Sequence, residues 1–292
     1  MKNEEKAWLQ ELAMSASQIQ LKDKTLHWSI STSKNTYFAE SLIWQGKTSS
    51  ICEGYFDKGD QRIEILVKII KDWHDNPRAI NEIKILKHLW SEENPNQIHL
   101  PVLYDQFRMK DKRIGIILKQ FYGNNLETIR SHPLYVNGVS DYHAAWMLSR
   151  MLAVAGFAHT KGVIHGNIEP HHVLVRPYDH NVCLVDWSWA LQNETEFKTV
   201  NEKFSAPEVK IGEAMTSSDL YSIGKCIVYL LNGNTEDDSM PENVDIRFQR
   251  FVKNLLITSP YQRARDAWAT LQKLAELRVE IWGPEKFVVF DW

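Results

Sequence analysis

The sequence predicts an α+β protein with two lobes: an N-terminal lobe built on an antiparallel β-sheet with one main helix, and a mainly helical C-terminal lobe. Short segments rich in β-branched residues precede residue 122, and long segments with helical spacing of apolar residues follow Asn125. The change falls near the sequence Tyr122-Gly123-Asn124. The 292 residues are 43% hydrophobic, which is enough apolar material for both cores.

The first lobe is expected to contain five strands and one helix. Alternating or β-branched patterns predict strands at residues 37–44, 51–56, 63–70, 102–109 and 113–121. The sequence Asp-Lys-Gly-Asp at residues 57–60 predicts a hairpin turn between the second and third of these. Residues 77–90 predict a helix, because Ile80, Ile83, Leu86 and Leu89 share one helical face.

The second lobe is expected to be built from long helices. Apolar periodicity predicts them at residues 144–161, 219–231, 247–257 and 265–277.

The domain organisation predicted from these patterns has four parts. Residues 1–35 form an N-terminal helical extension, whose helix spans residues 4–20, with a polar stretch at 29–35. Residues 36–121 form the first lobe and residues 122–278 the second. Residues 279–292 form an aromatic tail with a strand-like run at 287–290, which we expect to pack on the domain or on a partner.

Composition argues against several function classes. The formal net charge of −3 and the lack of an extended basic run give no indication of nucleic-acid or membrane binding. The acidic N-terminal sequence lacks a continuous apolar stretch, and no window approaches about 18 apolar residues, so we expect a cytoplasmic protein. Cys52, Cys183 and Cys226 are scattered and are expected to be packing residues.

A series of short motifs runs through both lobes in a fixed order. They are Ile65-Leu66-Val67-Lys68, Glu82, His165-Gly166-Asn167, Asp186-Trp187-Ser188, Ala206-Pro207-Glu208, Asp219-Leu220-Tyr221-Ser222-Ile223-Gly224 and Ser259-Pro260 with Arg263. Each motif alone is weakly specific. Together, over residues 38–274, they resemble the motifs of the eukaryotic-like protein kinase superfamily, including its H-R-D, D-F-G and A-P-E segments. The resemblance implies a bilobal protein-kinase-like fold.

The resemblance also implies roles for particular residues. Lys68 would hold the phosphates of ATP, Glu82 would pair with Lys68, and Asp186 would bind Mg. Gly46 is the one glycine kept in the loop that covers the phosphates. Glu208 would form a buried ion pair with Arg263 in the second lobe.

Three positions of the catalytic loop depart from the kinase pattern. Asn167 stands where the catalytic Asp is expected and cannot accept a proton from an incoming hydroxyl. Glu169 replaces a Lys near the transferred phosphate. His172 replaces the second metal-binding residue, and Mg prefers oxygen ligands. The neighbouring His171 is not expected to form a zinc pair with His172, because adjacent side chains point apart.

Two changes affect the predicted nucleotide pocket. The phosphate loop reads Trp-Gln-Gly-Lys-Thr-Ser-Ser-Ile at residues 44–51, so bulky Trp44 and Ser49 replace glycines that allow close approach of the backbone to phosphate. Leu66 replaces the small residue that lies over adenine in kinases. We therefore expect ATP and Mg binding to be weak or absent.

The favoured interpretation is a pseudokinase that acts as a scaffold or an allosteric module for a protein partner. One alternative is an active, atypical Ser/Thr protein kinase that uses Lys68 and Asp186, with Glu169 as a displaced base. A second is a small-molecule phosphotransferase, since His165-Gly166-Asn167 and Val185-Asp186-Trp187 resemble motifs of aminoglycoside-phosphotransferase-like enzymes. Gly166 replaces the Arg that reads a phosphorylated activation loop, so control through Thr195 or Thr199 is not expected.

Overall fold

A computed structural model of the chain describes residues 21–22, 25–192 and 203–291. The chain divides into two units: Met1–Lys87 with Pro101–Gln120, and His88–Leu100 with Phe121–Trp292. The first unit carries an antiparallel sheet and the second is mainly helical, so the predicted α+β fold with two lobes is confirmed. The residues 88–100, which we had assigned to the first lobe, group with the second unit through their contacts.

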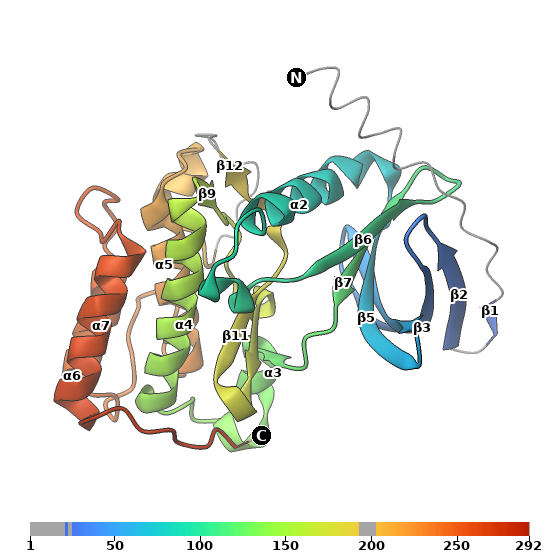
Figure 1. The fold of residues 1–292 in the computed structure, drawn as a ribbon. Helices are drawn as coiled ribbons and strands as arrows, with labels where there is room; N and C mark the ends of the chain where they lie inside the picture. The colour runs from blue at the N-terminus through green and yellow to red at the C-terminus, as the bar shows by residue number, and fades with distance from the viewer. Residues whose placement is uncertain (1–20, 23–24, 193–202, 292) are drawn as a thin grey trace. The chain divides into compact units, whose positions relative to one another are not determined.

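The first unit is built on one seven-stranded antiparallel sheet in the order β1-β2-β3-β4-β5-β7-β6 (Figure 1). Its strands are β1 (Leu21–Lys22), β2 (Thr25–Ser31), β3 (Thr36–Gln45), β4 (Ser49–Lys58), β5 (Gln61–Ile70), β6 (Leu103–Arg108) and β7 (Ile114–Lys119). The predicted hairpin joins β4 to β5 through Gly59, whose φ of 61° suits glycine. The five predicted strands are all present.

Residues 25–31 form strand β2, whereas the sequence analysis predicted a polar stretch at residues 29–35. It pairs antiparallel with β3, from Thr25 opposite Ser41 to Ser31 opposite Thr36. The reason is the alternation of Leu26, Trp28 and Ile30 with polar residues, which is a two-residue period typical of a strand. The predicted helix at residues 4–20 lies outside the described residues.

The core of the first unit lies on one face of this sheet. Period-two alternation along β5 buries Ile65, Val67 and Ile69, which join a cluster with residues of the other strands. Helix α2 (Asn76–Leu89) follows a 3₁₀ turn, η1 (Trp73–Asp75). The Asn76 side chain accepts a hydrogen bond from the amide of Ile114 and donates one to the carbonyl of Lys112, so it fixes the start of α2 to the β6–β7 hairpin.

The second unit is organised around helix α4 (Asp141–Thr160), which contacts α5 and α7 (Figure 1). The other helices are α3 (Leu126–Ser131), α5 (Thr216–Leu230), α6 (Ile246–Leu255) and α7 (Ala267–Trp282), with 3₁₀ turns η2 (Pro95–His99), η3 (Pro133–Tyr135), η4 (Pro170–His172), η5 (Pro177–Asp179), η6 (Trp187–Trp189) and η7 (Pro207–Ile211). Strands β8 (Asn124–Asn125), β10 (Val173–Arg176) and β11 (Asn181–Leu184) form one small sheet, and β9 (Val163–Ile164) pairs with β12 (Leu191–Gln192).

Close packing of α4 against α7 depends on Gly156. A Cβ atom at this position would lie 2.8 Å from the Trp268 ring, so only glycine allows the observed approach. Helix α7 extends beyond the predicted end at residue 277 to Trp282. It stops at Gly283, whose φ of 78° is favourable for glycine after a helix.

The aromatic tail packs on the second unit. This is one of the two arrangements expected from the sequence, the other being packing on a partner. Phe290 is buried and stacks on Tyr135 with ring centroids 5.0 Å apart, and Phe287 stacks on His180 at 4.2 Å. The hydroxyl of Tyr135 donates to the carbonyl of Asp291. The strand-like run at residues 287–290 forms no strand, and the rings of Phe287 and Phe290 supply its packing.

Candidate functional site

The first unit contains a buried ion pair between β5 and α2. Lys68 Nζ donates to Glu82 Oε2 at 2.6 Å, and both side chains are almost completely buried. Two-residue alternation along β5 places Lys68 on the face opposite Val67. The predicted pairing of Lys68 with Glu82 is therefore present. Removing either partner would take one charge away from this buried pair.

The turn between β3 and β4 differs from a loop that is open to phosphate. The Gly46 amide donates to the carbonyl of Ser49 at 2.9 Å, so this N–H is used within the turn. The indole of Trp44 lies against Gly46, where an added Cβ would come within 1.8 Å of the ring. In this arrangement the side chain of Trp44 covers the face of the Gly46 backbone.

Leu66 lies on β5 in register with Glu53 of β4 and Leu118 of β7, and its side chain is half-buried. Its effect on an adenine ring stays a prediction.

In the second unit, His165 connects the catalytic loop to the Asp186 segment. Its Nε2 donates to the carbonyl of Val185 at 3.1 Å, and its Nδ1 accepts from the amide of Asn167 at 3.2 Å. Burial lowers the pKa of His165 to about 4, so the ring is neutral at physiological pH. The ring also meets Trp187 edge to face, with centroids 4.6 Å apart.

Asp219, at the start of α5, fixes the backbone of the same loop. Its carboxylate accepts hydrogen bonds from the amides of His165 (2.8 Å) and Gly166 (2.9 Å), and from His159 Nε2 (2.9 Å). Burial acts to raise the pKa of Asp219, but the hydrogen bond and charge of His159 help to lower it overall. Gly166 has a φ of 73°, a conformation that favours glycine. His159 was missed by the sequence analysis, since a histidine at the end of an apolar helix gives no local signal.

The three altered catalytic-loop positions come together around His172. The Nδ1 of His172 lies 2.8 Å from the backbone carbonyl of Asn167 and donates to it. Its Nε2 then lies 3.3 Å from Asp186 Oδ2 and 3.5 Å from Glu169 Oε1. Asp186 has a φ of 62°, which is an unusual backbone conformation for a residue other than glycine and is typical of functional sites.

This donor set does not fit the metal arrangement that the resemblance implies. Mg prefers a tight octahedron of oxygen ligands, whereas a ring nitrogen of His172 faces Asp186. No group of three or more His, Cys, Asp or Glu side chains suited to hold a metal occurs in residues 21–22, 25–192 or 203–291. Asn167 supplies no carboxylate that could act as a base. The predicted site residues Asn167, Glu169 and Asp186 are therefore neighbours, but His172 lies among them.

His171 has a different partner from His172. Its Nε2 contacts Glu127 at the start of α3, so the two adjacent rings interact with different groups.

The predicted pair between Glu208 and Arg263 is confirmed. Arg263 donates to both carboxylate oxygens of Glu208, at 2.7 and 3.2 Å, and the two side chains are 0% and 3% exposed. The hydroxyl of Ser218 also donates to Glu208 at 2.8 Å. Burial alone would raise the pKa of Glu208, but these hydrogen bonds outweigh it and the pKa is lowered.

Comparison with known proteins agrees with the fold and the motif order. A sequence profile described as "Protein kinase domain" matches residues 37–276. The chain belongs to the protein kinase family. Serine/threonine-protein kinase D of Synechocystis sp. is 23% identical to this kinase-family chain over 244 residues, which covers 73% of the chain and 46% of that protein.

Serine/threonine-protein kinase PknA of Nostoc sp. is 26% identical over 212 residues, covering 65% of this kinase-family chain and 36% of PknA. The chain thus spans less than half the length of these curated relatives. Protein kinase domains in general use ATP and Mg. Among the helices of the described part, none is both long and apolar enough to cross a bilayer.

Proposed function

We propose that this kinase-family domain is a pseudokinase: a scaffold or allosteric module that binds a protein partner and carries out little or no phosphoryl transfer. The observation that carries the proposal is the position of His172 between Asp186 and Glu169. The His172 imidazole contacts the carboxylate of Asp186, which would otherwise bind Mg. The same imidazole stands at the position of the expected second metal ligand, which is therefore also missing.

The charge at residue 169 supports the same conclusion. A carboxylate replaces the ammonium group expected near the transferred phosphate, so an attractive interaction becomes a repulsive one. Two unit charges about 5 Å apart interact by roughly 3 kcal/mol at an effective dielectric constant near 20. Reversing the sign would therefore raise the barrier to transfer by several kcal/mol, which corresponds to several orders of magnitude in rate.

The first unit gives independent support. Backbone N–H groups of a phosphate loop must approach the nucleotide closely. Here the Gly46 amide is bonded to Ser49 and the Trp44 ring covers the glycine. Nucleotide would have to displace this ring and break the turn, so affinity for ATP should be low.

The test is a restoration experiment on purified protein. Wild type should show no transfer of phosphate from ATP-Mg to itself or to generic substrates, and little thermal stabilisation by ATP-Mg. The triple variant N167D/E169K/H172N returns the kinase pattern to the catalytic loop and should gain Mg-dependent nucleotide binding. Its matched control is the same triple variant with Asp186→Ala. Wild-type activity that disappears in Asp186→Ala would overturn the pseudokinase proposal.

A second candidate function is an active, atypical Ser/Thr protein kinase. The observation that favours it is the buried pair of Lys68 and Glu82, which is the arrangement needed to hold the phosphates of ATP. Under this alternative, Lys68→Met abolishes both activity and stabilisation by ATP, while Lys253→Met on the exposed face of α6 leaves them unchanged. Under the pseudokinase proposal, the Lys68→Met change alters stability but no activity.

A further inference from the structure

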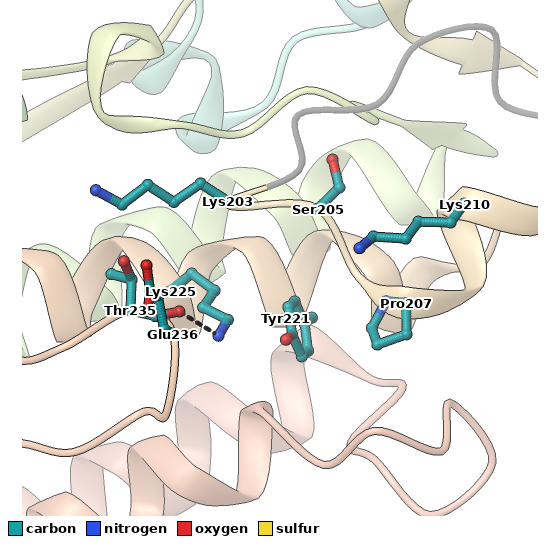
Figure 2. Close-up of a pocket in the computed structure, with 8 residues that line it drawn as sticks. All are labelled: Lys203, Ser205, Pro207, Lys210, Tyr221, Lys225, Thr235 and Glu236. Carbon is teal, nitrogen blue, oxygen red and sulfur yellow. Dashed lines mark hydrogen bonds between the residues drawn. The ribbon is translucent and has the colours of Figure 1, made fainter.

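The buried cation beside the cavity between residue 203, η7 and α5 is already paired (Figure 2). Lys225 Nζ donates to the carbonyl of Thr235 at 2.8 Å and also to the carboxylate of Asp238. Lys225 therefore fixes the loop after α5 and offers no free charge to a ligand. Buried groups whose charge can change near neutral pH lie instead under the aromatic tail.

The aromatic tail covers two histidines of the second unit. Phe290 meets the ring of His143 at a steep angle, with centroids 5.1 Å apart, and Phe287 stacks on His180 at 4.2 Å. His143 lies in the first turn of α4, and His180 immediately precedes β11. Each imidazole is therefore covered by one phenylalanine of the tail.

Trp146 of α4 joins the two histidines from below. Its indole Nε1 donates to His143 Nδ1 at 3.0 Å, and its ring stacks on His180 with centroids 4.2 Å apart and an angle of 3° between the planes. Because Nδ1 of His143 accepts this hydrogen bond, the ring is neutral and carries its one proton on Nε2. A second proton would go to Nδ1 and would set two N–H groups against each other.

The surroundings of His143 mainly oppose a positive charge. Burial is the largest cause of its lowered pKa, and a charge on His180, whose ring centroid is 6.3 Å away, acts in the same direction. The carboxylate of Asp291 at the end of the tail acts in the opposite direction and is outweighed. On α4 itself, the neighbouring ring is the uncharged Tyr142.

The pKa of His180 is also lowered, mainly by burial. The cations of Arg150 and Arg278 act in the same direction, whereas Asp179 and a hydrogen bond with the backbone of Val288 act against it. The two aromatic faces that sandwich this ring would also attract an imidazolium. The imidazole on α4 is therefore the more acid-sensitive of the two.

We propose that the tail is an acid-sensitive strap, which is held closed over His143 and His180 while both rings are neutral and loosens when they gain a proton. The strap is also held by the hydroxyls of Tyr135 and Tyr142, which donate to backbone carbonyls of the tail. Tyrosine titrates only near about pH 10, so these two bonds do not change in mild acid. This goes beyond the proposed pseudokinase function, because it assigns a conformational switch outside the catalytic loop.

The direction of the pH effect follows from burial of the two rings. A released tail leaves them in water, where histidine has a pKa of about 6.5, and the closed tail lowers that pKa. Closure is therefore fully favoured above about pH 6.5 and weakens as pH falls below this value towards the lowered pKa of the closed state. Over that interval, each histidine weakens closure by up to about tenfold per pH unit.

The first test measures the contribution of the tail to stability at two pH values, with the full chain and no nucleotide. Urea unfolding compares wild type with Phe290→Ala above and below the ordinary pKa of histidine, at about pH 7.5 and about pH 5.5. Expressed as an equilibrium constant, the contribution of Phe290 should fall by up to about tenfold at the lower pH. Effects of acid on the rest of the chain cancel in this comparison.

Two sets of variants assign the effect to the histidines. In an H143N/H180N background the contribution of Phe290 should be the same at both pH values, because Asn cannot be protonated. The amide at 143 can still accept from Trp146, and Asn suits the φ of 53° at residue 180. His74→Asn changes an exposed histidine of the first unit and is the matched control, for which the pH dependence should stay as in wild type.

The second test follows the His143 ring directly by NMR titration of the full chain. Its pKa should be lower in wild type than in F287A/F290A, where the covering rings are absent. An equal pKa in these two proteins, or an equal contribution of Phe290 at both pH values in wild type, overturns the proposal. A pH dependence that persists in H143N/H180N overturns it as well, because another group would then be its cause. None of these results depends on whether the protein transfers phosphate.

Discussion

Replacing Arg263 by Met should strongly destabilise the second unit. The guanidinium donates to both oxygens of Glu208 and to the carbonyls of Ile257, Ser217 and Thr258, at 2.7–3.2 Å. Its loss leaves the Glu208 carboxylate buried without a cation, which costs roughly 3–5 kcal/mol in comparable cases. For a unit of this size, each kcal/mol lowers the melting temperature by about 2–4 °C, so the expected loss is roughly 6–20 °C.

A double-mutant cycle measures the pair itself. Glu208→Gln removes the charge but keeps the shape, and E208Q/R263M should recover part of the loss in R263M because no buried charge remains. Arg247→Met removes an exposed pair with Asp245 and is the matched control, for which little change is expected. An R263M variant that melts within about 2 °C of wild type, less than 1 kcal/mol, would refute the reasoning.

The pair of Glu208 and Arg263 also predicts that the stability of the second unit depends on pH. The pKa of Glu208 is lower in the folded state than the value of about 4.3 for an unfolded chain. The stabilisation from the ionised carboxylate is therefore complete above this unfolded value and is lost as pH falls through the folded pKa. The difference in stability between wild type and E208Q should shrink in acid below about pH 4.

Three further predictions concern other parts of the chain. Trp44→Ala uncovers Gly46 and should increase the thermal stabilisation by ATP-Mg, whereas unchanged stabilisation would show that the ring is no barrier. Gly156→Val drives side-chain atoms into Trp268 and should cost about 1–3 kcal/mol in urea unfolding; a neutral effect would contradict close packing of α4 on α7. Phe290→Ala removes a buried ring and should cost about 3 kcal/mol by the same measurement, while no loss would mean that the tail adds no stability.

Much of the fold could be predicted from periodicity alone. The strands of the first unit and the long helices of the second have regular apolar patterns, because each buries one face against its own neighbours. The prediction failed at strand β2 and at the tail. Strand β2 was missed although Leu26, Trp28 and Ile30 alternate with polar residues, and the strand-like run of the tail forms no strand, since its rings pack singly against Tyr135 and His180.

The candidate site was likewise predicted only in part from the sequence. Motif order predicted the buried pairs of Lys68 with Glu82 and of Glu208 with Arg263, and the structure contains both, although the partners are far apart in the chain. The role of Asp186 in binding Mg stays a prediction. The sequence also identified the substitutions at Asn167, Glu169 and His172, since the identity of a side chain fixes its charge and its possible ligands.

The sequence by itself determined the kinase-like order of elements and the chemical groups that the catalytic loop carries. Only the tertiary structure decided which side chains meet: that His172 faces Asp186 and Glu169, and that Trp44 lies on Gly46. The physical reason is that side-chain identity is local, whereas electrostatic and steric effects depend on distances that are set when the whole chain packs.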